Sequence, residues 1–171
     1  MESTTNLEVW LRGPITDVPA LLQPVAHALL QSVEELEKAG IGFPSPLLWE
    51  RPCQTASVGF HLQHLSGILD RLFTYARGES LNENQLNYLK QEGHAPYPNC
   101  SFHQLFSSYQ LQVEKCLDQL KTVNLDHLTD LRYVGRAMIP STQIGLLFHA
   151  AEHAQRHVGQ LIVTARILRQ S

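Results

Sequence analysis

Apolar residues recur at intervals of three and four along most of the chain, and this spacing predicts amphipathic helices. The first predicted helix runs from Val18 to Leu36, with Gly40 as its stop signal. Pro24 lies inside this pattern, so either the helix is kinked there or its regular part begins there. The segment from Gly42 to Pro52 is rich in proline and is predicted to be a connecting loop.

A second helix is predicted from about Ser57 to Ala76, with Gly78 as its C-terminal stop. A shorter helix is expected to follow, from Asn82 to about Glu92. Its start is indicated by Ser80 and Glu83, which have the spacing of a capping box. Residues 57–92 are therefore predicted to form one long helix and one short one.

The third long helix follows a loop predicted at His94–Asn99, where two prolines occur. Ser101 and Gln104 again have the spacing of a capping box. From there, apolar residues continue at helical intervals to about Val123.

The remainder of the chain predicts an extended connection followed by the longest helix. Residues Leu131–Pro140 are predicted to be extended because Val134, Gly135 and Pro140 are poor helix formers, whereas Ser141–Leu168 has a helical pattern that Ser141 or Thr142 can cap. Four long helices without a convincing strand pair predict an all-α fold, a four-helix bundle formed as one domain by residues 1–171.

Composition supports an ordinary globular domain and argues against nucleic acid as a partner. The chain has 171 residues, enough to bury a core without disulfides. Its 13 Lys and Arg residues and 16 Asp and Glu residues are spread without a basic stripe, which a nucleic-acid-binding protein is expected to have.

The N-terminal residues, the lack of a long apolar stretch and the cysteines predict a cytoplasmic protein with no membrane partner. Residues Met1–Asn6 are polar, and no stretch approaches the roughly 18 apolar residues of a membrane span. Cys53, Cys100 and Cys116 are odd in number and widely spaced, so free thiols in a reducing compartment are expected.

Histidines are the unusual feature of the composition, because five of the nine fall in two short runs. His149, His153 and His157 are four residues apart and form one stripe on the last helix. His153 and His157 border the apolar side of that helix, whereas His149 lies nearer its polar side. This placement favours His153 and His157 as an inward pair of metal ligands. The alternative is that these imidazoles are surface residues or hydrogen-bonded core groups.

A metal ion held by protein alone usually needs at least a third ligand, which must come from another helix. The second helix offers His61 and His64, and a bundle places such a helix against the last one. By the helical period alone His61 is the more central of the two on the apolar face, so the period does not select His64. Three neutral imidazoles suit Zn²⁺, Ni²⁺, Cu²⁺ or Fe²⁺ better than Mg²⁺ or Ca²⁺.

One other motif matches the last helix. Residues 149–153 fit H-x-x-E-H, an inverted zinc-protease motif in which the glutamate, here Glu152, is the general base. That class needs a further acidic ligand downstream, but none of the 18 residues after His153 is acidic. The match is interpreted as a coincidence, and Glu152 as a solvated or supporting carboxylate.

Two segments of the sequence resemble the DinB-like superfamily, which includes YfiT-like metal-dependent hydrolases and bacillithiol transferases. They are VGFHLQHL at residues 58–65 and HAQRHVGQL at residues 153–161, the second of which is similar to the family signature H-x-x-x-H-R-G-Q. The resemblance implies His64, His153 and His157 as metal ligands. Val158 departs from the signature, because many members have arginine there.

The resemblance also implies a fold and an activity. The expected fold is a four-helix bundle with up-down-down-up connectivity, often a homodimer. The expected function is that of a metal-dependent enzyme, a thiol S-transferase or hydrolase with an open three-histidine site, with Zn²⁺ or Ni²⁺ as the ion and iron or manganese as alternatives. Its partners would be a small-molecule substrate and a low-molecular-weight thiol. A non-catalytic metal-binding or stress-related bundle is the alternative function.

The sequence assigns no catalytic residue besides the metal ligands. Arg71 and Tyr75 follow His64 along the same helix and are candidates for binding an anionic substrate. Neither a Ser-His-Asp arrangement nor a glycine-rich phosphate loop can be assigned from spacing.

Overall fold

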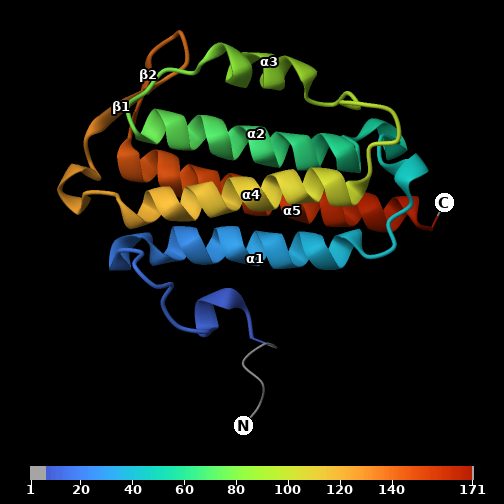
Figure 1. The fold of residues 1–171 in the computed structure, drawn as a ribbon, viewed down its shortest axis with the longest axis horizontal. Helices are drawn as coiled ribbons and strands as arrows, with labels where there is room; N and C mark the ends of the chain where they lie inside the picture. Colours follow the sequence, from blue (N-terminus) through green and yellow to red (C-terminus); the bar gives the residue numbers. More distant parts are fainter. Residues whose placement is uncertain (1–6, 171) are drawn as a thin grey trace.

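The computed structural model describes residues 7–170, and this part of the chain is mostly helical. Four long helices lie side by side, and a short helix and a hairpin of two strands lie outside them (Figure 1). The helices are α1 (Gln23–Gly40), α2 (Val58–Ala76), α3 (Glu83–Gln91), α4 (Phe102–Lys121) and α5 (Gln143–Leu168), and the strands are β1 (Leu131–Val134) and β2 (Ile139–Thr142). No helix in residues 7–170 is long and apolar enough to cross a membrane.

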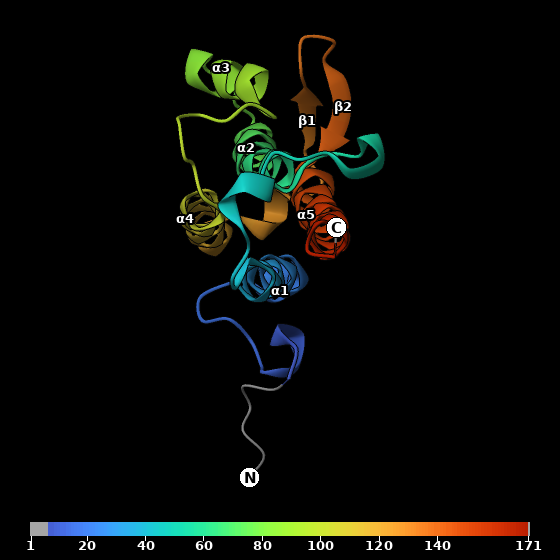
Figure 2. The same cartoon turned by 90° about the vertical axis from the view of Figure 1, so that its right-hand side faces the viewer.

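The long helices surround one apolar core. α2 and α1 each contact both α4 and α5, so every long helix has two long neighbours, as the end-on view shows (Figure 2). Leucines from α1 and α2, such as Leu29, Leu62 and Leu69, are fully buried between them. The Tyr109 hydroxyl on α4 is also buried, 2.5 Å from the Ser32 hydroxyl on α1. Burial of these apolar side chains holds the helices together.

The start of α1 resolves the question raised by Pro24. The proline lies in the first turn of α1, where its missing N–H breaks no hydrogen bond, and a 3₁₀ turn at Ala20–Leu22 precedes it. The regular helix therefore begins at the proline instead of being kinked by it. α1 ends at Gly40, as predicted, and a Cβ atom on Gly40 would collide with the ring of Phe102.

The predicted caps are confirmed for two helices and wrong for α3. Ser101 and Gln104 form the capping box of α4, and Thr142 caps α5 by accepting from the Gly145 amide at 3.1 Å. α3 is capped by Asn82 and Gln85, two residues later than the predicted Ser80 and Glu83. The Asn82 and Gln85 side chains satisfy each other's amide groups, at 3.0 and 2.9 Å.

The expectation of no strand pair is also wrong, because the predicted extended connection folds back on itself. β1 and β2 pair as antiparallel strands, with Leu131 opposite Thr142 and Val134 opposite Ile139. Gly135 in the turn has a positive φ of 65°, which glycine adopts without steric cost. The hairpin and α3 lie on the same side of the molecule, outside α2 and α5 (Figure 2).

Cys53 is exposed, Cys100 and Cys116 are buried, and all three are free thiols as expected. Residues 1–6, whose polar composition contributed to the expected cytoplasmic location, lie outside the described residues.

Candidate metal centre

The structure brings His64 of α2 together with His153 and His157 of α5. One ring nitrogen from each residue lies within 4.8 Å of the other two. Nε2 of His64 and Nε2 of His153 are 3.0 Å apart. Two nitrogens bound to one tetrahedral zinc ion would be about 3.3 Å apart, given the usual Zn–N distance. The three rings are therefore arranged as a group that can hold one metal ion.

A buried carboxylate fixes the orientation of His64. Oε2 of Glu92 is 2.7 Å from Nδ1 of His64, and Oε1 of Glu92 accepts from Arg71 at 2.7 Å. A carboxylate paired with a guanidinium accepts and does not donate, so Nδ1 of His64 carries the hydrogen. Nε2 then keeps its lone pair and faces His153. Metal-binding histidines commonly have such a carboxylate partner on the other nitrogen.

His61 supports His157 and does not belong to the three-histidine group. Its side chain is buried, and its Nδ1 is 2.9 Å from Nδ1 of His157. If His157 donates in this hydrogen bond, its own Nε2 retains the lone pair that metal binding requires. The structure thus brings into the group His64, which the resemblance implies, and not His61, which is the more central of the two by the helical period alone.

Burial keeps three of these rings neutral. It lowers the pKa of His61 and of His153 to about 4, and that of His157 to about 3. Burial is the largest cause of each lowered pKa, and the electrostatic effect of the neighbouring His64 is the second. Because a metal displaces the proton from an imidazole nitrogen, rings that are already neutral at pH 7 bind it without competition from protons.

His153 differs from an ordinary buried core histidine. Within residues 7–170, its Nδ1 is buried and has no hydrogen-bond partner, and its Nε2 is hydrogen-bonded only to Nε2 of His64. Buried polar atoms in proteins are nearly always paired. His153 is therefore not held in place as a hydrogen-bonded core group, which was one alternative to metal binding for these histidines.

A second group of possible ligands shares His153 and includes His149 and Glu152. Here the carboxylate already has two partners, because Glu152 lies 2.6 Å from His149 and 2.6 Å from Arg156. The side chain of His149 is 45% exposed. We therefore interpret these residues as a surface network beside the centre, in agreement with the supporting role expected for Glu152.

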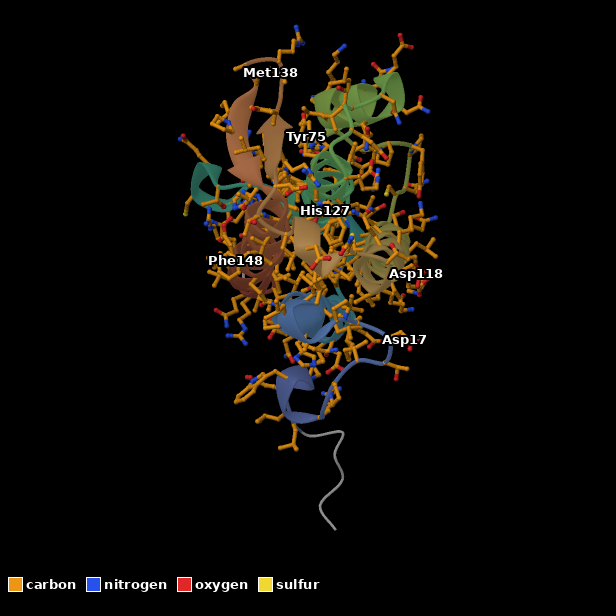
Figure 3. The ribbon with its side chains drawn as sticks, turned by 90° about the vertical axis from the view of Figure 1, so that its left-hand side faces the viewer. Asp17, Tyr75, Asp118, His127, Met138 and Phe148 are labelled. Atoms are coloured by element: carbon orange, nitrogen blue, oxygen red, sulfur yellow. The ribbon has the colours of Figure 1, made fainter. Side chains whose placement is uncertain are left out.

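The two residues considered for anion binding are not at the centre. Arg71 is buried against Glu92, so its charge serves the carboxylate that holds His64. Tyr75 lies between α3 and the hairpin, where it lines a different pocket (Figure 3). Sequence reasoning did not find Glu92, which is 28 residues from His64. The one available signal was an acidic residue at the negative end of the predicted short helix, where the helix dipole disfavours it.

The centre is not closed to solvent. The side chain of His64 is 16% exposed, and all three rings are only partly buried. A groove of about 730 Å³ lies on the side of His61, between α5 and the segment before α2. Its lining includes Thr55, Ala56, His61, Arg156, Gly159 and Gln160. The groove meets the surroundings of the centre at His61, which bonds His157, whereas the three proposed ligands do not line it.

No family model and no curated protein matches this chain. Its structure is similar to the crystal structure of a protein from Streptococcus pneumoniae, with a TM-score of 0.61 over 85% of this chain and 88% of that one. The two sequences are 14% identical, so the likeness concerns the fold alone.

Proposed function

We propose that the chain is a DinB-like four-helix bundle with up-down-down-up connectivity. Support for this connectivity comes from the course of the chain in Figure 1, where α1 and α5 run in one direction and α2 and α4 in the other. Further support comes from the two segments that carry the resemblance, since their histidines approach one another across α2 and α5.

We further propose that His64, His153 and His157 bind a divalent transition metal, Zn²⁺ or Ni²⁺ before iron or manganese. The observation that carries this proposal is the group of three ring nitrogens with Glu92 behind His64. Three neutral ligands leave the ion with its full charge and an open position, and such an ion supplies Lewis acidity that lowers the pKa of a bound water or thiol. The proposed activity is thiol S-transfer or hydrolysis on a small molecule.

Metal content tests the centre. Elemental analysis of protein purified without added metal is expected to give about one ion per chain, and His64→Ala and His153→Ala should each remove it. His103→Ala is the matched control, because His103 is exposed on α4 and, among residues 7–170, hydrogen-bonds only Ser107. Unchanged metal content in both centre variants would remove the proposal.

Activity is tested separately on metal-loaded protein. Electrophilic substrates are offered with several low-molecular-weight thiols, and hydrolysis is followed without thiol. The variant His64→Ala should abolish any turnover that belongs to the centre. Metal binding without turnover under all of these conditions would favour the alternative of a non-catalytic metal-binding bundle.

We also propose a cytoplasmic homodimer, on the basis of the free cysteines and of the resemblance. Sedimentation equilibrium measures the dimer directly, and a monomer at micromolar concentration would contradict it.

A further inference from the structure

A second pocket lies between α3, the end of α2 and the hairpin. Its volume is about 740 Å³, within the range of pockets that hold small ligands. Most of its walls are apolar, including Leu81, Leu86, Leu89, Leu131, Tyr133 and Met138. Tyr75 of α2 lies at the gap between the two walls (Figure 3). The pocket is thus built by two consecutive helices, α2 and α3, and by a hairpin that lies much later in the sequence.

Several apolar side chains that line this pocket are largely exposed to solvent. Leu131 is 60% exposed, Met138 58% and Leu89 43%, and they reach the same pocket from the hairpin and from α3. Apolar side chains are scattered over most protein surfaces, but their convergence on one hollow is typical of ligand grooves. An apolar chain placed there would remove these side chains from water.

The pocket is lined by a positively charged side chain that has no partner within residues 7–170 and can pair with a ligand. Arg132 donates to the carbonyls of Ala76 and Leu131, and the acidic lining residue Glu79 is paired with Arg77. Arg136, at the turn of the hairpin, lines the pocket without a hydrogen bond or ion pair to any residue in 7–170. An anionic group is the complement of this unpaired guanidinium.

We infer that this pocket binds a single-chain amphiphile with an anionic head, of the fatty-acid class. The alkyl chain lies between α3 and the hairpin, and the carboxylate pairs with Arg136. The site goes beyond the proposed metal function and is separate from it. Tyr75 follows His64 by eleven residues on α2, which places the two about 16 Å apart along the helix.

Titration calorimetry with dodecanoate, below the concentration at which it self-associates, tests the head group. The full chain should bind it at one site. Arg136→Gln should weaken binding about tenfold or more, because it removes a charge-assisted hydrogen bond, whereas Arg136→Lys keeps the charge and should lose less. Arg166→Gln is the matched control, because Arg166 is an exposed arginine near the end of α5 that does not line the pocket. This variant should bind dodecanoate as the parent does.

Ligand series test the tail and the sign of the charge. Butanoate should bind at least tenfold more weakly than dodecanoate. Leu89→Ser should weaken the binding of dodecanoate but not that of butanoate. Absence of dodecanoate binding, equal binding by Arg136→Gln, or equal affinity for dodecyltrimethylammonium would overturn the inference. Metal content and thermal unfolding of Arg136→Gln should match the parent, so failure here is distinguishable from failure of the metal centre.

Discussion

At the scale of single residues, Glu92 determines the tautomer and the orientation of the His64 ring. Its two oxygens hold Nδ1 of His64 on one side and the Arg71 guanidinium on the other, and its side chain is only 5% exposed. This pair of contacts fixes both the tautomer and the direction of the His64 ring. A residue outside the histidine group therefore prepares one of its ligands.

We predict that Glu92→Gln lowers the affinity for metal by about 10- to 100-fold, the usual effect of losing such a carboxylate partner. Competition with a chromogenic chelator measures it. Glu152→Gln is the matched control, since Glu152 also pairs with a histidine but outside the three-histidine group. A larger loss for Glu152→Gln would mean that the group containing His149 is the real centre.

The same scale explains which site residues the sequence could predict. His153 and His157 share one helix, so their spacing alone fixes their relative positions. The choice between His61 and His64 depends on how α2 is rotated against α5, which the helical period did not determine. Glu92 reaches His64 only because α3 folds back over α2, a tertiary contact with no local pattern.

At the scale of elements, the close approach of α3 to α2 depends on Gly67. A Cβ atom there would lie 2.5 Å from Oε1 of Glu92 and 2.6 Å from a guanidinium nitrogen of Arg71. Neither buried group has room to move away easily, because each holds the other. Gly67 therefore makes space for the pair behind His64.

Gly67→Ala is predicted to weaken metal binding and to lower the free energy of unfolding, although alanine favours a helix. Gly159→Ala is the comparison, since a Cβ at Gly159 meets nothing within 4 Å. That variant should gain about 0.5–1 kcal/mol from helix propensity. Urea unfolding and chelator competition measure both effects, and stabilisation by Gly67→Ala would contradict the packing argument.

The sequence predicted long elements better than short ones. Each long helix has many apolar positions that agree on one period, so errors at single residues cancel. The cap of α3 depended on two competing polar pairs, and Asn82 with Gln85 formed in place of Ser80 with Glu83. The hairpin has strands of only four residues, which are too short to give a clear alternation.

At the scale of the whole molecule, the centre joins helices that are far apart in the chain. His64 and His153 are 89 residues apart, and a shared ion would tie α2 to α5. A ligand that binds only the folded state stabilises it in proportion to the logarithm of its concentration.

Removal of metal is therefore expected to lower the thermal midpoint. At a metal concentration 100 times the dissociation constant, the loss is about 2.7 kcal/mol, or roughly 5–10 °C for a chain of this length. Differential scanning calorimetry with and without chelator measures it. The chelator should leave His64→Ala unaffected, and an equal shift in that variant would exclude the centre as the cause.

Acid should destabilise the metal-free protein. Unfolded histidine titrates near pH 6.5, whereas burial lowers the pKa of His61 to about 4 in the folded protein. Between these pH values the unfolded chain binds more protons, so the free energy of unfolding falls as the pH falls from 6.5 to 4. A loss of roughly 2–3 kcal/mol is expected for this ring over that window.

Urea unfolding at pH 7 and pH 5, in the presence of chelator, measures this loss. His61→Asn should reduce the dependence on pH, whereas His103→Asn, on the surface of α4, should not. Identical pH dependence in the parent and in His61→Asn would contradict it.

The contact of Glu92 with His64 also has a consequence for motion. α3 has nine residues, little buried surface of its own and a large exposed face, so it is the helix most able to detach transiently from the rest. Its end is joined to the metal centre through Glu92. A bound ion that favours the attached position should therefore slow amide hydrogen exchange throughout α3, although α3 contributes no ligand to it.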